Sequence, residues 1–214
     1  MLIFSDIAGQ YQTLLKLVEQ IPDEYKTRQI ALGDLIDRGP DSLPVVRYFM
    51  NHEALLGNHE LMMLEALYQP YFWMRPWLQN GGAATLLSFG LTEVKGDCLE
   101  KLNETPEVQW MDKLPLFVSE QDVIVTHAPI IEFPPVKRGT FVWNREDPVR
   151  RDKFQIFGHN AYMYRNVVDN GVEWFEDDEG QFAVCIDSSH LDTLTAIHWP
   201  SKKIWQQKYI EQEE

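Results

Sequence analysis

The first part of the chain repeats one pattern three times: a short apolar segment, a polar turn and then a helical pattern. The apolar segments are residues 1–5, 29–32 and 54–56, and each is followed at once by Asp or by Asn-His. Repeated strand–loop–helix units are typical of a parallel sheet whose connections are helices. Ligands of such sheets bind at the carboxyl ends of the strands. The pattern therefore predicts an α/β fold with a site where these strands end.

The remaining segments predict further helices and a strand-rich second half. Ser42 is placed to cap a helix that carries Val45, Val46 and Phe49. An aromatic- and Gly-rich stretch is expected to form a cap or loop before another helix. That stretch covers residues 70–82, and the helix covers residues 83–89. In the second half, residues 117–119 and 123–126 are expected to form paired strands. Hairpin elements around Pro200-Ser201 are expected at residues 182–186, 193–199 and 203–207. No long linker or internal repeat interrupts the chain, which predicts a single domain over residues 1–214.

Composition narrows the class of protein. The 214 residues carry a net charge of −14, which disfavours an extended nucleic-acid-binding surface. No apolar run approaches the roughly 20 residues that span a bilayer, and the N-terminus lacks the pattern of a signal peptide. Cys98 and Cys185 lie far apart without CxxC spacing, which is typical of buried thiols in a reducing compartment. These features predict a cytoplasmic protein that does not bind membranes. Its oligomeric state stays open.

Five short motifs place oxygen or nitrogen ligands beside glycine or at strand ends. They are Ser5-Asp6-Ile7-Ala8-Gly9, Gly33-Asp34-Leu35-Ile36-Asp37-Arg38-Gly39, Gly57-Asn58-His59-Glu60, Thr126-His127-Ala128 and Phe157-Gly158-His159-Asn160. Mixed carboxylate, amide and imidazole ligands suit Mn, Fe or Zn. Two metal ions about 3.5–4 Å apart need a bridging ligand, for which a carboxylate is the natural choice.

In order and spacing these motifs resemble the phosphoprotein phosphatase family of binuclear metallophosphoesterases, in particular its short bacterial and phage serine/threonine phosphatases. The resemblance runs from residue 6 to residue 160, and the Gly-Asp-x-x-Asp-Arg-Gly and Gly-Asn-His-Glu motifs are its most specific part. It implies a calcineurin-like metallophosphoesterase sandwich, with a β-sheet core, flanking helices and a metal site at the strand ends. It also implies two divalent metal ions, Mn first and Fe, Zn or Mg as alternatives.

The resemblance assigns the metal ligands residue by residue. Asp34 would bridge both ions, Asp6 would belong to the first site, and Asn58, His127 and His159 would complete the second. The implied reaction is in-line attack of a metal-activated hydroxide on phosphorus.

The resemblance also assigns the catalytic side chains. His59 would be the general acid that protonates the leaving oxygen, and Asp37 would orient its imidazole. Arg38 would clamp the phosphate oxygens, and Arg145 is similar to the family's second substrate arginine.

Position 8 departs from the family pattern. The pattern has a metal-binding histidine there, and alanine has no ligand atom. We therefore expect a weakened first metal site and impaired or abolished activity. Because every other motif is intact, an engineered exchange is the preferred interpretation of Ala8, with a natural variant as the alternative.

The sequence leaves three functions open. The preferred one is a protein serine/threonine phosphatase acting on phosphomonoesters. The alternatives are a hydrolase of dinucleoside polyphosphates or other small molecules, whose family carries the same motifs, and a catalytically dead phosphate-binding protein. His190 follows Asp187-Ser188-Ser189 at a strand end where the family often has Asp-Thr-Gly. A structural role is its preferred interpretation, with a position at the border of the site as the alternative. Trp73, Trp77 and Trp143 are also interpreted as structural.

Overall fold

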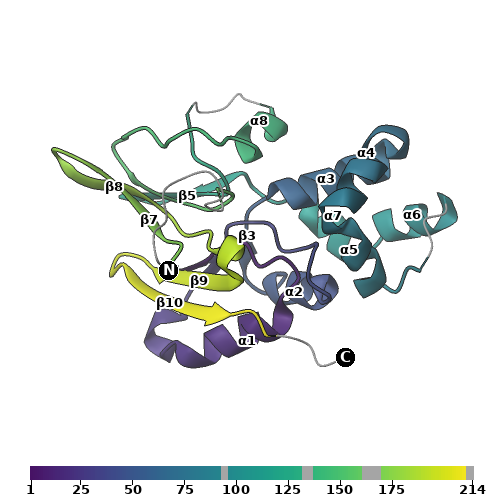
Figure 1. The fold of residues 1–214 in the computed structure, drawn as a ribbon, viewed down its shortest axis with the longest axis horizontal. Coiled ribbons are helices and arrows are strands. Elements are labelled where there is room, and N and C mark those ends of the chain that lie inside the picture. Colours follow the sequence, from purple (N-terminus) through teal and green to yellow (C-terminus); the bar gives the residue numbers. More distant parts are fainter. Residues whose placement is uncertain (93–95, 132–136, 161–169, 211–214) are drawn as a thin grey trace.

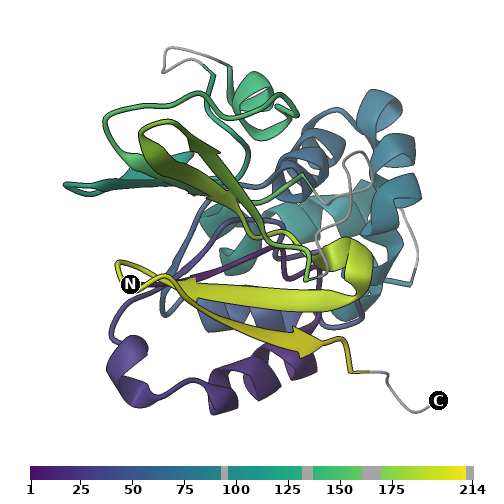
Figure 2. The ribbon, with the colours of Figure 1, turned by 60° about the vertical axis from the view of Figure 1, so that its left-hand side comes forward.

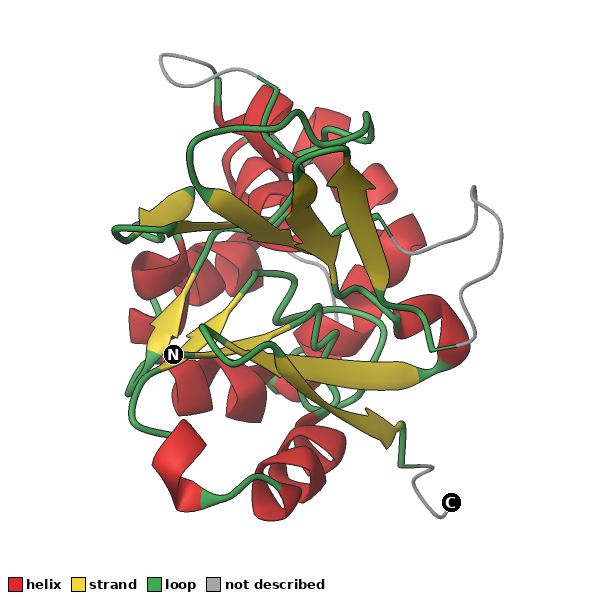
Figure 3. Cartoon of the chain, turned by 90° about the vertical axis from the view of Figure 1, so that its left-hand side faces the viewer, coloured by secondary structure: helices red, strands yellow, loops and turns green. Residues whose placement is uncertain are grey.

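Two five-stranded sheets lie face to face in the computed structural model, which describes residues 1–92, 96–131, 137–160 and 170–210 (Figure 3). The first sheet has the order β10-β9-β1-β2-β3, and the second has the order β4-β5-β6-β8-β7. The bounds in the first sheet are β1 (Leu2–Phe4), β2 (Gln29–Ala31), β3 (Glu53–Ala54), β9 (Thr193–His198) and β10 (Lys203–Lys208). Those in the second are β4 (Phe117–Ser119), β5 (Val123–Thr126), β6 (Phe154–Phe157), β7 (Glu173–Asp177) and β8 (Gly180–Cys185).

The first sheet joins both ends of the chain. Strands β1, β2 and β3 are parallel, with Leu2 opposite Gln29 and Ile30 opposite Glu53. Strand β9 pairs antiparallel with β1, so that Leu2 also lies opposite His198. Figure 2 shows the β9–β10 hairpin with helix α1 (Tyr11–Gln20) against it. The predicted hairpin around Pro200 is confirmed.

The second sheet has a parallel centre and antiparallel edges. Strands β5, β6 and β8 are parallel, while β4 and β7 pair antiparallel with β5 and β8 at the two edges. Strand β5 is fully buried and consists of Val, Ile and Thr, as expected for a strand covered on both faces, while β6 and β8 are buried towards their carboxyl ends.

Apolar side chains fill the space between the sheets and the space beneath the first sheet. Ile3 and Leu32 from the first sheet meet Val125 and Ile156 from the second in one buried cluster. On the opposite face of the first sheet, α1 buries Leu14 and Leu17, and α2 (Ser42–Phe49) buries Val45, Val46 and Phe49. Burial of such side chains is the main favourable contribution to folding.

The middle of the chain is helical and lies to one side of both sheets (Figure 1). It contains α3 (Asn58–Tyr68), α4 (Pro70–Trp77), a π-helical turn η2 (Leu78–Gly82), α5 (Ala83–Ser88), α6 (Gly96–Asn103) and α7 (Pro106–Met111). Further along the chain come α8 (Arg138–Val142) and two 3₁₀ turns, η1 (Asp23–Tyr25) and η3 (Ser189–Leu191). No helix among the described residues is long and apolar enough to cross a membrane.

The structure corrects several predicted elements. Residues 70–82 are helical and not a loop, because Pro70 lies at a helix start and α4 packs along α3. Strands β6 and β7 were not predicted, and residues 182–186 pair with these two strands, away from the β9–β10 hairpin. Ser42 does not cap α2, because its hydroxyl accepts a hydrogen bond from the Asp37 backbone N–H.

Candidate active site

The five sequence motifs meet where strands of both sheets end. Asp6 follows β1, Asp34 follows β2, and Asn58 starts the helix after β3. From the second sheet, His127 follows β5 and His159 follows β6. All five side chains are buried. The structure thus brings every predicted metal ligand to one edge of the fold, although their role as ligands stays a prediction.

Four of these residues converge on one point. The Oδ1 atom of Asn58 lies 2.9 Å from His127 Nε2 and 2.7 Å from His159 Nδ1. Asp34 Oδ1 lies 3.5 Å from His127 Nε2, and ligand atoms of Asp34, His127 and His159 all lie within 4.8 Å of one another. The Nε2 atom of His159 is buried and has no hydrogen-bond partner. An oxygen and imidazole set with a buried, unpartnered nitrogen fits a divalent transition metal.

One imidazole of this group is oriented by the backbone. His127 Nδ1 donates a hydrogen bond to the Leu32 carbonyl at 3.1 Å, which leaves the lone pair of Nε2 facing Asn58 and Asp34. Hydrogen bonds of this kind fix the tautomer of metal-binding histidines.

The backbone at the site is strained. Positive φ values occur at Ala8 (49°), Asp34 (50°), Asp37 (72°), Arg38 (65°) and His159 (63°). This left-handed conformation is uncommon for residues other than glycine, and such residues concentrate at functional sites. The tight turns place side chains of successive motifs side by side.

Glu60 joins two of the motif loops, which the sequence analysis did not foresee. Its carboxylate is fully buried and accepts hydrogen bonds from the backbone N–H groups of Gly57 (2.9 Å), Asp34 (2.8 Å) and Leu35 (2.8 Å). Burial and the nearby charge of Asp34 raise the pKa of Glu60 to about 7. Glu60 therefore fixes the loop that carries Asp34 against the start of α3.

The predicted acid–base pair is in place. His59 Nδ1 donates a hydrogen bond of 2.7 Å to Asp37 Oδ2. The carboxylate of Asp37 also accepts hydrogen bonds from Trp77 Nε1 (3.0 Å) and Thr85 Oγ1 (2.6 Å). Arg38 donates to the other ring nitrogen, His59 Nε2, at 3.0 Å. Trp77 therefore holds Asp37 besides packing in the core.

Charges shift the pKa values of these side chains in opposite directions. Burial lowers the pKa of His59, but the carboxylates of Asp34 and Asp37 outweigh it, and the pKa lies above its usual value. Burial raises the pKa of Asp34, but the surrounding imidazoles, chiefly His127, bring it below its usual range. Burial lowers the pKa of His127. Burial and the charge of His127 lower the pKa of His159 to about 2. His127 and His159 are therefore neutral at pH 7, as metal binding requires.

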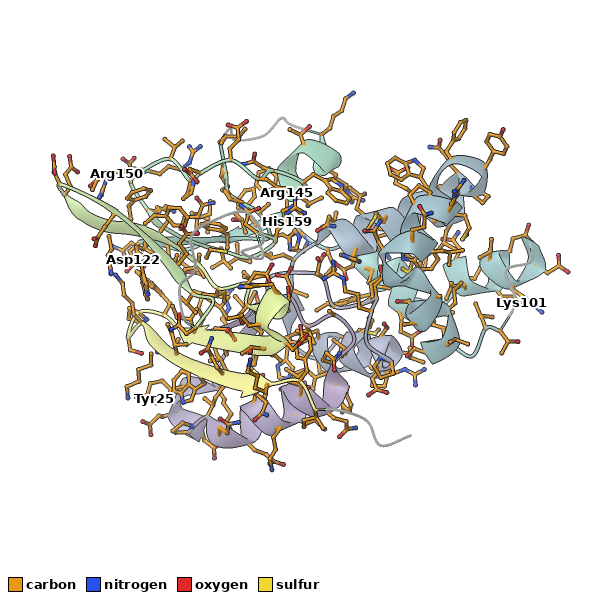
Figure 4. The ribbon with its side chains drawn as sticks, viewed as in Figure 1. Tyr25, Lys101, Asp122, Arg145, Arg150 and His159 are labelled. Carbon is orange, nitrogen blue, oxygen red and sulfur yellow. The ribbon has the colours of Figure 1, made fainter. Side chains whose placement is uncertain are left out.

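These side chains line a cavity of about 270 Å³. Arg38 and Arg145 line it as well. Arg145 Nη1 donates a hydrogen bond to the His159 carbonyl at 3.4 Å, and Figure 4 shows Arg145 and His159 near each other. The cavity also contains Asp187, Ser189 and His190 from the end of β8 and η3. His190, interpreted from sequence as structural, thus borders the site.

A family model of calcineurin-like phosphoesterases matches residues 1–202, which is most of the chain. The chain belongs to the calcineurin-like phosphoesterase family. This membership confirms the predicted fold class and identifies the chain as a metallophosphoesterase.

Sequence relatives of this calcineurin-like phosphoesterase include symmetrical bis(5'-nucleosyl)-tetraphosphatases. The protein from Methylobacillus flagellatus is 28% identical over 171 residues, which cover 75% of this chain and 54% of the relative. The one from Cellvibrio japonicus is 31% identical over 176 residues, covering 75% and 56%. The chain therefore spans about half the length of the curated relatives it matches. These relatives bear the name of the small-molecule alternative and not that of the preferred protein phosphatase.

The fold is also similar to solved structures. A crystal structure described as a diadenosine tetraphosphatase superposes with a TM-score of 0.63 at 19% identity, covering 98% of this chain and 94% of the other. At this identity the likeness concerns the fold alone.

Several residues at the site escaped the sequence analysis. Trp77, Thr85 and Ser42 hold Asp37, yet each lies outside the recognised motifs. Their sequence gives no periodic or spacing signal for this role. Asp187 did carry a signal, since it follows a strand end as Asp6 and Asp34 do.

Proposed function

We propose that this calcineurin-like phosphoesterase hydrolyses dinucleoside polyphosphates, cutting a phosphoanhydride bond with two divalent metal ions. The observation that carries this proposal is the similarity to several symmetrical bis(5'-nucleosyl)-tetraphosphatases over most of the chain. A dinucleoside polyphosphate is therefore preferred to a phosphorylated protein as the substrate, and Mn is the first metal ion to test.

The chain's own residues support each part of this reaction. Asp34 would bridge the two ions, Asn58, His127 and His159 would hold one, and Asp6 would hold the other. When bound, the ions would supply an activated water and stabilise charge on the phosphoryl oxygens. Arg38 and Arg145 on the cavity rim would bind phosphate oxygens, for which guanidinium geometry is suited.

His59 would donate the proton to the leaving phosphate. In the structure Arg38 donates to His59 Nε2, so this nitrogen carries no proton while that contact lasts. A phosphate group on the rim would draw Arg38 away and remove a charge that lowers the pKa of His59. The remaining carboxylates, Asp34 and Asp37, would then favour the protonated imidazole needed for general acid catalysis.

An aromatic groove beside the cavity supports a nucleotide substrate. The Trp143 ring packs edge-on against His159 at 5.8 Å between centroids. Trp143 also lines a neighbouring groove of about 480 Å³ with Tyr68, Trp73 and Lys137. Exposed aromatic faces bind bases by stacking, and a lysine adds attraction for phosphate. A nucleoside could therefore lie in this groove with its phosphates at the metal site.

Turnover of diadenosine tetraphosphate tests the proposal, compared with a phosphoserine peptide at equal concentration and with Mn²⁺ present. We expect the dinucleotide to have the higher kcat/KM. Trp143→Ala should raise KM for the dinucleotide without raising it for p-nitrophenyl phosphate, and Trp174→Ala, in β7, is the matched control. Equal kcat/KM for both substrates, or preference for the peptide, would reject the dinucleotide assignment.

A phosphorylated protein is the second candidate substrate. It is favoured by the Gly-Asp-x-x-Asp-Arg-Gly and Gly-Asn-His-Glu motif pair, which protein phosphatases share. The same comparison decides it, through a higher kcat/KM on the peptide. Phosphate binding with no turnover of either substrate would favour the third possibility, a phosphate-binding protein disabled by Ala8.

A further inference from the structure

One fully buried hydroxyl, that of Thr85 in α5, contacts Asp37, the residue expected to orient His59. The Thr85 Oγ1 atom donates a hydrogen bond of 2.6 Å to Asp37 Oδ1. Thr85 is not among the described residues that line the cavity of about 270 Å³, whereas His59 is. Any effect of Thr85 on a reaction in this cavity must therefore pass through Asp37.

The Thr85 hydroxyl holds Asp37 at two places at once. Besides its bond to the carboxylate, Oγ1 accepts a hydrogen bond from the Asp37 backbone N–H at 2.9 Å. Ser42 Oγ lies 3.0 Å from the same atom. Because the single hydroxyl proton of Thr85 goes to Asp37, Ser42 is the donor in that contact, and both lone pairs of Thr85 Oγ1 are occupied. The Thr85 hydroxyl thus fixes the Asp37 side chain relative to its own backbone.

The two carboxylate oxygens of Asp37 have different partners. Oδ1 accepts the hydrogen bond from Thr85, and Oδ2 accepts the one from His59 Nδ1 at 2.7 Å. Trp77 Nε1 lies 3.1 Å from Oδ1 and 3.0 Å from Oδ2, so it favours neither. Thr85 is therefore the donor that distinguishes the two oxygens. While it holds Oδ1, Oδ2 stays turned towards His59.

Asp37 and Arg38 form a strained turn that depends on contacts from outside it. Their φ values are 72° and 65°, and non-glycine residues keep this left-handed conformation only where the surrounding structure determines it. The Asp37 N–H is held by Thr85, and the Arg38 N–H donates to the Gly81 carbonyl at 3.3 Å. Both residues of the turn are thus hydrogen-bonded to the segment that includes η2 and α5.

A contact one turn further along α5 joins the same two helices without touching Asp37. Ser88 Oγ accepts a hydrogen bond of 2.9 Å from the Leu43 backbone N–H in α2. If Thr85 served only to hold α5 against α2, the loss of either hydroxyl would have the same kind of effect. Ser88 therefore provides a matched control for Thr85.

We propose that Thr85 is a positioning residue for proton transfer, because its hydroxyl holds Asp37 in the orientation that keeps the His59 ring in place. The proposal rests on the proposed function, since it concerns the general acid of that reaction. The affected step is transfer of the His59 Nε2 proton to the leaving phosphate oxygen as its bond to phosphorus breaks. Without the hydroxyl, the Asp37 carboxylate could turn and His59 would lose its fixed orientation, while the predicted metal ligands would be unchanged.

Thr85→Val removes the hydroxyl and keeps the shape of the side chain. The Asp37 N–H retains a second acceptor, Ser42 Oγ at 3.1 Å, so the fold should persist, which circular dichroism and Mn content check. The kinetic constants kcat and KM for diadenosine tetraphosphate are measured with Mn²⁺ for Thr85→Val, Thr85→Ser and Ser88→Ala. Thr85→Val is also combined with His59→Gln.

Thr85→Val should lower kcat by about 10–10²-fold, because displacement of a reacting group by about 1 Å can cost that much. KM should change little, since no residue that lines the cavity is altered. Thr85→Ser should restore most of kcat, and Ser88→Ala should stay close to the parent. In the His59→Gln background, Thr85→Val should have almost no further effect, because it acts through His59.

Three kinetic results would overturn the proposal. The first is an unchanged kcat in Thr85→Val, and the second is an equal loss of kcat in Ser88→Ala. The third is a loss of kcat from Thr85→Val that is as large with His59→Gln as without it, because the hydroxyl would then act on something other than the acid.

A spectroscopic measurement separates this inference from the proposed function. The His59 Nδ1–H proton, in a short hydrogen bond to a carboxylate, should give a downfield ¹H NMR signal that is absent in His59→Gln. The spectra are recorded with diamagnetic Zn²⁺ in place of Mn²⁺. The signal should persist in the parent, Thr85→Ser and Ser88→Ala, and disappear in Thr85→Val.

The two readouts together assign any failure. A parent that shows this dependence on Thr85 but does not hydrolyse the dinucleotide would reject the proposed function and leave the positioning of His59 standing. A parent that hydrolyses the dinucleotide, with a signal and a kcat that Thr85→Val leaves unchanged, would reject this inference alone. Neither turnover nor a signal that depends on Thr85 would reject both.

Discussion

At the scale of single residues, the contact between His59 and Asp37 is the basis of the proposed proton transfer. Asp37 is fully buried, and its carboxylate accepts hydrogen bonds from His59 Nδ1, Trp77 Nε1 and Thr85 Oγ1. This contact fixes the orientation of the His59 ring and leaves Nε2 as the nitrogen that the proposed substrate would meet.

Asp37→Asn should lower kcat and move the high-pH limb of the kcat profile to lower pH. The general acid must be protonated, so kcat falls as pH rises through the pKa of His59. The charge of Asp37 raises the pKa of His59, and a neutral asparagine at position 37 would lower this pKa.

His59→Gln removes the proposed acid and should lower kcat by about 10²–10⁴-fold. The effects of Asp37→Asn and His59→Gln are both measured with the proposed dinucleotide, and metal content should stay unchanged in both variants. A high-pH limb that Asp37→Asn does not move would show that His59 is not the acid.

Trp77→Phe isolates the second donor to Asp37. The benzene ring keeps most of the packing, but the indole N–H that reaches Asp37 at 3.0 Å is lost. A buried carboxylate deprived of one donor should cost about 1–3 kcal/mol of unfolding free energy. Urea unfolding measures this, with Trp110→Phe in α7 as the control. Equal losses in the two variants would indicate packing alone.

At the scale of elements, the site depends on how closely the strand-end loops approach. A Cβ on Gly57 would lie 2.3 Å from both the backbone N and Oδ1 of Asp34. Gly33 has a φ of +107°, and its Cβ would lie 2.6 Å from Gly57 N. These two glycines let the loops after β2 and β3 touch, and so place Asp34 beside Asn58.

Gly57→Ala should therefore displace Asp34 and reduce bound Mn. The overpacked contact should also cost about 1–3 kcal/mol of unfolding free energy. Gly139→Ala in α8 is the matched control, because open space surrounds that position and alanine favours a helix by up to about 1 kcal/mol. Unfolding by urea and Mn content are measured on both. Full Mn content in Gly57→Ala would mean that the loops can separate without loss.

Sequence patterns anticipated these elements unevenly, for physical reasons. The β1–α1, β2–α2 and β3–α3 units were predicted because apolar runs end at Gly and Asp, and such runs carry local information. Strand β7 escaped because its segment is acidic and lies at an edge, where only one neighbour and little burial constrain the residue types. Helix α4 escaped because the aromatic- and Gly-rich composition of residues 70–82 suggested a cap or loop, whereas contact with α3 stabilises the helix.

The candidate site shows the same division. Asp6, Asp34, Asn58, His127 and His159 were found from motifs, and the structure places them together. Asp187 and His190 belong to no recognised motif, and only the chain's three-dimensional path brings them to the cavity. The strand end before Asp187 was a weak signal, but a single sequence does not show which strand ends come together.

At the scale of the whole molecule, we expect stability to depend on metal because acidic side chains are buried at the proposed site. The chain carries a net charge of −14, and Asp6, Asp34 and Asp187 are among its few buried acidic residues. An ion that binds only the folded state stabilises it by about 2.7 kcal/mol at a free concentration 100 times its Kd.

Removal of metal by EDTA should therefore lower Tm, and added Mn²⁺ should restore it. Differential scanning fluorimetry with and without Mn²⁺ measures the shift. Asp34→Asn, which loses the carboxylate proposed to bridge the two ions, should show little or no shift with Mn²⁺. A parent Tm that Mn²⁺ leaves unchanged would contradict a folded-state metal site.

The pairing of β1 with β9 also sets a condition for assembling the edge of the fold that carries Asp6. Ser5, next to Asp6, is hydrogen-bonded to Thr195, which lies 190 residues further along the chain, and Leu2 pairs with His198. Contacts between segments so far apart form late in folding, because a long loop must close first. A chain truncated before β9 would therefore carry all five motifs and still lack the partner strand that holds Asp6 in place.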